Sequence, residues 1–366
     1  MPSLETQIES AVARIKALIP IGEDTKDYVA RQLELQLESI SSTAPMGVIP
    51  SSLLSNTRMY ASARMSAELI DQPKRLVGRP EGVVDLGTIE WILRPALPLS
   101  EGLLEPVAGG PWRHVRANIV EKEEKGVCRL DISMPGYDSI HIGTGFTVGT
   151  DPHVRNILTN AHVVEEAIRL GWTKSVDIRF GCDFKRYSMG CAEDLSFLAT
   201  EYRMHPLYDL ALLYFQPDDF KASELEPLTL SDEAPDPTIG ADVGVLGHPS
   251  FDSRLDPFPK YFGFGNEFGI KRFSPGRVRV VEHREWRGAN IEAMLHDAST
   301  LSGSSGSCIL DLSTKKVVGL HFGGWPISAR SMMVDGTDVL AQLFQANGAV
   351  PLWKLRRDSL LQPFFK

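Results

Sequence analysis

The sequence predicts a mainly β protein in which two antiparallel β-barrels follow an N-terminal helical region. From about residue 112 onward, short apolar and β-branched runs alternate with turn residues, and no long helical pattern separates these runs. Many short strands joined by turns are typical of all-β barrels. The first 70 or so residues instead repeat apolar side chains at helical spacing. The expected strands are 127–132, 141–148, 154–158, 176–180, 210–215, 243–246, 277–281, 308–310 and 316–321.

The helical region is expected over residues 1–72. Leu4, Ile8 and Val12 would share one helical face, and an alanine-rich helix is expected over residues 58–70. Such a region either packs on the barrels as a plain extension or binds a regulatory protein partner. The sequence leaves both interpretations open.

A connector and a barrel domain are expected after the helices. Residues 73–111 are rich in proline and glycine, which favours a connector along the surface. Residues 112–366 are then the barrel domain, with barrel 1 at about 112–232 and barrel 2 at about 240–355.

Composition excludes several classes of protein. The chain has 366 residues, 43% of them hydrophobic, and a formal net charge of −9, as in an ordinary globular protein. No run of Lys and Arg is long enough to follow a phosphate backbone, so we expect no nucleic-acid partner. No stretch of about 18 apolar residues indicates a membrane span. The N-terminus lacks the charged-then-apolar plan of a secretory signal, so we expect a cytoplasmic location.

The cysteines and most histidines suggest structural roles. Four cysteines are too few for a disulfide framework; Cys182 and Cys191 could pair in an exported chain, but reduced thiols fit the cytoplasm better. No Cys/His spacing fits a zinc site and no glycine-rich loop fits a nucleotide, so we expect neither a metal nor a cofactor. Four histidines stand outside any nucleophile motif and are interpreted as structural or surface residues: His205, His248, His283 and His296.

Three motifs point to nucleophilic catalysis. His162 lies in Thr-Asn-Ala-His-Val-Val, Asp209 in Tyr-Asp-Leu-Ala-Leu-Leu, and Ser305 in Thr-Leu-Ser-Gly-Ser-Ser-Gly-Ser. A serine hydroxyl is a poor nucleophile at pH 7 until an imidazole takes its proton and a carboxylate holds that imidazole in the right tautomer. The three residues therefore indicate acyl transfer, and peptide hydrolysis in particular.

Ser305 is the expected nucleophile among the serines of its segment. Gly303 lies two residues before it and Gly306 one residue after it, and glycine lets the backbone turn so that the amides of Gly303 and Ser305 face one developing oxyanion. Three neighbouring serines lack this arrangement: Ser302, Ser304 and Ser307.

With these motifs in this order, and with Gly-Thr-Gly-Phe at 143–146, the barrel domain resembles the trypsin-like serine peptidase superfamily, in its bacterial branch that includes glutamyl endopeptidases. The resemblance implies two six-stranded barrels with the catalytic residues in the cleft between them. It makes His162 the general base, Asp209 its orienter and Ser305 the nucleophile, with the oxyanion hole on the amides of Gly303 and Ser305. The expected function is a serine endopeptidase that acts on protein or peptide substrates through an acyl-enzyme.

The same resemblance extends to a specificity pocket. In trypsin an aspartate six residues before the nucleophile receives Arg or Lys, and Ser299 holds that place here. Ser299, Thr300 and His321 match the pattern with which glutamyl endopeptidases bind an acidic side chain. The resemblance thus implies a preference for Glu or Asp immediately before the scissile bond.

Regulation and the alternative function both concern the N-terminal region. Relatives that are made as zymogens pair a new N-terminus with an aspartate just before the nucleophile, and this chain has Ser304 there. Control is therefore expected from the N-terminal extension. The alternative function is a catalytically silent trypsin-fold binding or adaptor protein whose helical region recruits partners.

Overall fold

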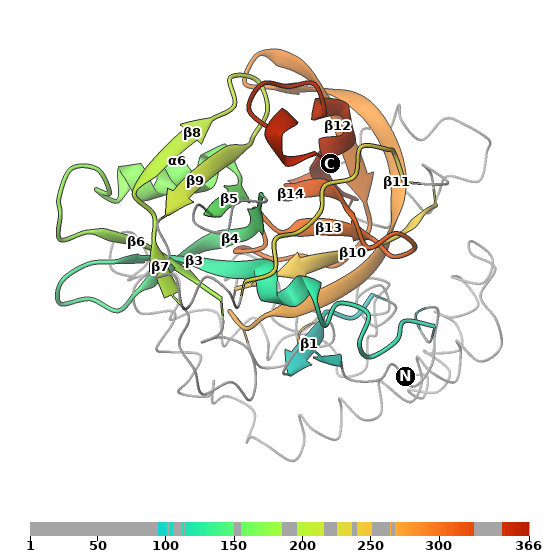
Figure 1. The fold of residues 1–366 in the computed structure, drawn as a ribbon, viewed down its shortest axis with the longest axis horizontal. Helices are drawn as coiled ribbons and strands as arrows, with labels where there is room; N and C mark the ends of the chain where they lie inside the picture. The colour runs from blue at the N-terminus through green and yellow to red at the C-terminus, as the bar shows by residue number, and fades with distance from the viewer. Residues whose placement is uncertain are drawn as a thin grey trace, which may run out of the picture.

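Two curled antiparallel sheets make up most of the described part of the chain in the computed structural model (Figure 1). The predicted helical region at 1–72 lies outside the described residues and stays a prediction. Where the structure is described, no helix is long and apolar enough to cross a bilayer. The described residues are 94–100, 103–104, 112, 114–149, 155–184, 196–215, 225–235, 240–250, 264, 268–325 and 346–365.

The N-terminal sheet has seven strands in the order β7-β6-β3-β4-β5-β9-β8. Its edge strands β7 and β8 are separated only by Ala199 and Thr200, whose amides donate to the carbonyls of Phe180 on β6 and Tyr214 on β9. One nearly continuous segment therefore joins both edges, and the sheet curls on itself. The strands are β3 (Val127–Ser133), β4 (Ile140–Val148), β5 (Arg155–Thr159), β6 (Arg179–Asp183), β7 (Ser196–Leu198), β8 (Glu201–Met204) and β9 (Ala211–Phe215).

The C-terminal sheet has eight strands in the order β10-β13-β14-β15-β12-β11-β1-β2. Because β10 also pairs with β11, six of the strands form a ring, and β1 and β2 attach outside it at β11. The strands are β1 (Leu97–Ser100), β2 (Leu103–Leu104), β10 (Asp242–Gly247), β11 (Arg272–Trp286), β12 (Ala289–His296), β13 (Cys308–Asp311), β14 (Val317–Trp325) and β15 (Ala346–Pro351).

The totals of seven and eight strands differ from the six per barrel that the resemblance implies. In the N-terminal sheet, the break at Ala199 and Thr200 divides one segment into β7 and β8. In the C-terminal sheet, the additional strands β1 and β2 come from within residues 73–111, the predicted connector. Leu99 and Leu104 on these strands are buried, so this part of the segment belongs to the sheet and its core.

An α-helix and buried hydrophobic cores hold the described sheets in position. Helix α6 (Ala161–Arg169) follows β5 after Asn160 and buries Val163, Val164 and Ala167 in the core of the N-terminal sheet. A second core lies where the sheets meet and includes Phe146 of β4. Short 3-10 helices complete the described elements: η1 (Glu123–Gly126), η2 (Leu352–Leu355) and η3 (Gln362–Phe364).

Candidate active site

His162 and Asp209 form a hydrogen-bonded pair on the N-terminal sheet. Asp209 is fully buried in the loop before β9 and accepts twice from His162: the amide donates to Oδ1 at 3.0 Å and the ring Nδ1 to Oδ2 at 2.6 Å. A buried carboxylate is costly unless such donors satisfy it. Because the ring proton lies on Nδ1, the neutral imidazole keeps Nε2 as a proton acceptor.

Asn160 ties this pair to the start of helix α6. Its backbone is extended, with φ −82° and ψ 151°, so Asn160 is the last non-helical residue after β5 and the helix begins at Ala161. Its side-chain Nδ2 donates to the backbone carbonyl of Asp209 at 2.8 Å. The helix that carries His162 and the loop that carries Asp209 therefore hold each other in place.

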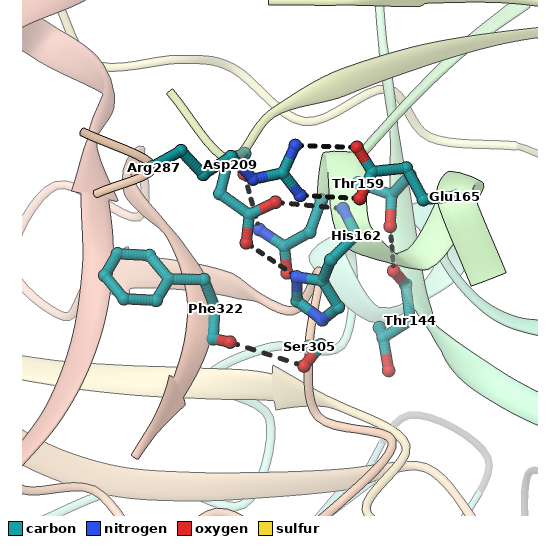
Figure 2. Close-up of polar contacts among 9 residues, drawn as sticks. Thr144, Thr159, His162, Glu165, Asp209, Arg287, Ser305 and Phe322 are labelled. Atoms are coloured by element: carbon teal, nitrogen blue, oxygen red, sulfur yellow. Dashed lines mark hydrogen bonds and ion pairs between the residues drawn. The ribbon is translucent and has the colours of Figure 1, made fainter. Parts of the chain in front are cut away.

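Ser305 lies opposite this pair, in the turn between β12 and β13 of the C-terminal sheet. Figure 2 shows the ring nitrogen of His162 that does not bond Asp209 facing the Ser305 hydroxyl. The Ser305 hydroxyl donates to the carbonyl of Phe322 on β14 at 3.5 Å, the long limit for a hydrogen bond. Little therefore holds the hydroxyl away from His162, and the structure brings the three predicted catalytic residues together.

The backbone around Ser305 needs glycine at two positions. Gly303 has φ +82° and Gly306 has φ +88°, a region that side chains with a Cβ rarely adopt. A Cβ on Gly306 would lie 1.9 Å from the carbonyl oxygen of Thr144. Within the described ranges, the amides of Gly303 and Ser305 donate to no other backbone carbonyl. Two free amides beside a nucleophile can bind a developing oxyanion.

Thr144 on β4 holds the Ser305 loop from the other sheet. Its amide donates to the carbonyl of Ser305 at 2.8 Å, and its hydroxyl donates to the carbonyl of Gly303 at 2.8 Å. The same hydroxyl accepts from the amide of His248 at 3.0 Å. The Gly-Thr-Gly-Phe motif contains this residue, but the sequence alone assigned it no contact.

Two histidines lie behind the same loop, His248 buried and His141 partly buried. Burial lowers the pKa of His141 well below its usual value, and the Arg129 guanidinium adds to this effect. Burial, assisted by the Lys271 ammonium, likewise lowers the pKa of His248. Both rings are therefore neutral at pH 7 and add no charge beneath Gly303. This agrees with the structural role expected for His248.

The three predicted pocket residues have different surroundings. Ser299 and Thr300 are partly buried on the loop after β12, and the Ser299 hydroxyl donates to the backbone carbonyl of Arg94 at 2.6 Å. His321 on β14 is buried, and its Nδ1 lies 3.2 Å from Nε2 of His296. The Ser299 proton is thus engaged by the protein itself, and so is the His321 ring, which contacts His296 and hydrogen-bonds the backbone of Gly348.

The two facing histidines are uncharged at neutral pH. Burial, followed by the Arg94 guanidinium, lowers the pKa of His296 to about 3. Burial also lowers the pKa of His321 well below its usual value, with further contributions from His296 and His162. His296 was interpreted from the sequence as structural, and its contact with a predicted pocket residue depends on the pairing of β12, β15 and β14.

Arg94 is a further neighbour of the predicted pocket. Besides its carbonyl contact with Ser299, its guanidinium pairs with the buried carboxylate of Asp297 at 3.5 Å. Arg279 pairs with the same carboxylate, and the amide of Arg277 donates to it at 2.6 Å. No local pattern marks Arg94, because 205 residues separate it from Ser299.

The structure describes most of the other cysteines and histidines for which the sequence made a prediction. Cys128, Cys182 and Cys308 are buried free thiols, whereas Cys191 lies outside the described residues. The ring of His205 bonds Asp358 at 3.1 Å, a structural contact. In the part of the chain that the structure describes, no three residues with His, Cys, Asp or Glu side chains are arranged to hold a metal ion.

Residues 143–320 match the family of the trypsin-like peptidase domain. A probable serine protease of Lysobacter enzymogenes is 28% identical over 272 residues, which cover 63% of this chain and 67% of that protein. Among solved structures, the active form of the Rv3671c protease of M. tuberculosis is 21% identical, with a TM-score of 0.43 over 74% of this chain and 90% of that one. The HtrA-type protease AlgW, solved with a decapeptide, is 16% identical, with a TM-score of 0.41 over 67% of each chain.

The family match supports a trypsin-like fold for this chain and a serine peptidase as the class of protein that it resembles. The narrower resemblance to glutamyl endopeptidases stays a prediction.

Proposed function

We propose that this chain is a serine endopeptidase that hydrolyses peptide bonds through an acyl-enzyme. His162 is its general base, Asp209 holds the imidazole, and Ser305 is the nucleophile. The observation that carries this proposal is the bonding of His162 Nδ1 to the buried Asp209, with the other ring nitrogen facing Ser305.

The reaction would proceed in two halves. Nε2 of His162 takes the proton of the Ser305 hydroxyl as Oγ attacks the carbonyl carbon, and the amides of Gly303 and Ser305 bind the resulting oxyanion. The imidazolium then gives its proton to the leaving amine, and the C–N bond breaks to leave an ester on Ser305. Water, deprotonated by the same nitrogen, attacks the ester carbon; the C–Oγ bond then breaks, His162 returns the proton to Ser305 Oγ, and the acid is released.

Active-site labelling tests this proposal. A fluorophosphonate should modify the wild-type protein, and Ser305→Ala and His162→Ala should lose the label. Ser302→Ala changes a serine of the same loop and should keep it. A folded wild-type protein that takes no label, or a label that survives Ser305→Ala, contradicts the proposal. The first of these outcomes would favour the alternative, a silent trypsin-fold binding or adaptor protein.

The finer part of the proposal is a preference for Glu or Asp immediately before the scissile bond. Ser299, Thr300 and His321 would surround that side chain, and the Ser299 hydroxyl would have to leave the Arg94 carbonyl in order to donate to it. No acidic residue stands at the position where trypsin receives Arg or Lys, which is Ser299 here. A buried carboxylate needs hydrogen bonds or an opposite charge, and His321 supplies a charge if it takes up a proton as the carboxylate arrives.

Cleavage of a denatured proteome tests this preference. Cuts should fall mainly after Glu and Asp, and His321→Ala should depress turnover of Glu substrates far more than turnover of Ala substrates. Cuts mainly after Arg, Lys or large apolar residues would refute the acidic pocket.

Control by the N-terminal extension and a cytoplasmic location are also proposals. The motivation for the first is the extension itself, together with Ser304 in the place of the zymogen aspartate. Cell fractionation with an antibody against the chain tests the second, and recovery in an exported fraction would contradict it.

A further inference from the structure

The proposed catalytic residues come from two separate sheets. His162 and Asp209 belong to the N-terminal sheet with its helix α6, and Ser305 belongs to the C-terminal sheet. Proton transfer between His162 and Ser305 therefore depends on the position of the two sheets relative to each other. Thr144 makes one cross-connection, on the side of the Ser305 carbonyl.

A second cross-connection joins helix α6 to the turn between β11 and β12. The Arg287 guanidinium donates twice to Glu165, from Nη1 to Oε1 at 2.6 Å and from Nη2 to Oε2 at 2.5 Å. Glu165 lies three residues after His162, on the same side of the helix. Figure 2 shows this ion pair beside Asp209 and His162.

The turn that carries Arg287 is fixed on its own sheet next to Ser305. The Trp286 ring packs on the Phe322 ring with centroids 5.5 Å apart, and the Arg287 guanidinium lies 5.7 Å from the centroid of the Trp286 ring. The carbonyl of Phe322 is the group that accepts from the Ser305 hydroxyl. The ion pair thus links the helix of the base to the immediate surroundings of the nucleophile.

The backbone at Arg287 is unusual for an arginine. Arg287 has φ +50° and Gly288 has φ +78°, the pattern of a two-residue hairpin turn in which Asn, Asp or Gly normally stands first. An arginine in this conformation costs free energy that an asparagine would largely avoid. Its long, bidentate side chain is what allows this position to reach Glu165.

We propose that Glu165 and Arg287 are positioning residues that clamp helix α6, and with it His162, against the sheet that carries Ser305. This inference rests on the proposed function. The clamp also keeps the surroundings of the base electrically balanced. The charged and titratable groups around His162 are Asp209 on the loop before β9, Glu165 on α6, Arg287 on the β11–β12 turn and His321 on β14.

Turnover of a small chromogenic peptide by single and double variants tests the clamp. Both ends are partly exposed, 49% for Arg287 and 42% for Glu165, so Glu165→Gln and Arg287→Gln should each lower kcat only about two- to fivefold, with KM nearly unchanged. The reversed pair, Glu165→Arg with Arg287→Glu, should recover most of the loss. The matched control is the Glu166–Arg169 pair, which is bidentate and exposed but lies wholly on α6. Glu166→Gln and Arg169→Gln should leave kcat unchanged.

The pH dependence of kcat/KM distinguishes positioning from a general loss of stability. Glu165→Gln leaves an unbalanced cation near the imidazole, so the acidic limb should move to lower pH. Arg287→Gln leaves an unbalanced anion, so this limb should move to higher pH. Equal losses in the control pair, no loss in either single variant, or no recovery in the reversed pair would overturn the proposal.

Amide hydrogen exchange separates this proposal from the proposed function. Glu165→Gln should speed exchange in the β11–β12 turn on the opposite sheet, and Glu166→Gln should not. This readout needs no activity. Unchanged exchange in the turn overturns the clamp even if the protein is a peptidase, and absence of fluorophosphonate labelling overturns the peptidase even if the turn responds.

Discussion

Asp209 shows how burial and hydrogen bonding select one state of the proposed catalytic pair. Its carboxylate has no solvent-exposed surface, and its two oxygens accept from the amide and the ring of His162. Because neither oxygen can donate, the ring of His162 has to present its proton at Nδ1. The tautomer required for general-base catalysis is therefore the one that the surroundings stabilise.

Asp209→Asn should abolish most of the activity without unfolding the protein. The amide is nearly isosteric, but its NH2 group would face the ring and favour the tautomer with the proton on Nε2. We expect kcat to fall by about 10⁴, as in other triads. Steady-state kinetics and a thermal melt measure the two effects, and a loss of less than tenfold would contradict the assigned role.

The proposed preference for acidic residues should strengthen as the pH falls. Burial holds the pKa of His321 below its usual value, so a Glu side chain that needs a charged ring has to bring about proton uptake. The ratio of kcat/KM for a Glu substrate to that for a Gln substrate should rise from pH 8 down to about pH 5, above the range in which the free Glu itself becomes protonated.

His321→Gln should flatten this dependence, whereas His283→Gln, a change on an exposed position of β11, should not. A ratio that is constant with pH in the wild-type protein would exclude His321 as the charged partner.

At the scale of elements, strands with β-branched, apolar sequences could be predicted within a few residues. β3, β4, β9, β10 and β13 are such strands. Strand β12 could not be predicted in this way, because its sequence Ala-Asn-Ile-Glu-Ala-Met-Leu-His is rich in helix formers. This segment becomes a strand through its pairing with β11 and β15.

The residues of the candidate site likewise divide into those that the sequence could predict and those that it could not. His162, Asp209 and Ser305 lie in short motifs that the sequence alone shows. Arg94 and Arg287 do not, since their partners Ser299 and Glu165 are 205 and 122 residues away in the chain and meet them only through the packing of strands.

The segment that contains Arg94 and β1 should be required for a stable pocket. Arg94→Ala would leave the buried carboxylate of Asp297 with fewer partners, and breaking a buried ion pair at one end typically costs about 3–5 kcal/mol. Arg279 pairs with the same carboxylate, but its side chain is 44% exposed, so Arg279→Ala should cost about 1 kcal/mol or less. Urea unfolding of the two variants measures the difference, and equal costs would contradict this account of Arg94.

For the molecule as a whole, part of the predicted connector at 73–111 packs into the folded body of the chain. Leu99 and Leu104 are buried in the core shared by the two sheets. A chain that begins at Ile92 keeps them, together with Arg94 and strands β1 and β2. A chain that begins at Trp112 loses all of these.

The two truncated chains should therefore behave differently. The longer one should fold and, compared with the full chain, report the regulatory effect of residues 1–91. The shorter one should melt at lower temperature, since each buried leucine contributes about 1.5–3 kcal/mol. Thermal melts and fluorophosphonate labelling measure both effects. Equal labelling of the longer chain and the full chain would leave the extension without a regulatory role, and an undiminished melting temperature of the shorter chain would contradict the contribution of Leu99 and Leu104.

The hold of Thr144 on the Ser305 loop has a consequence for the protein during its synthesis. The strands of the N-terminal sheet come from the stretch 127–215, so they leave the ribosome before β10 to β15 of the other sheet. The C-terminal sheet needs both β1 and β15, near opposite ends of the described chain, and its Ser305 loop is held by β4 of the N-terminal sheet. A nascent chain therefore cannot bring Ser305 to His162 until β15 has been synthesised, so the proposed catalytic centre assembles only after the strands of both sheets are complete.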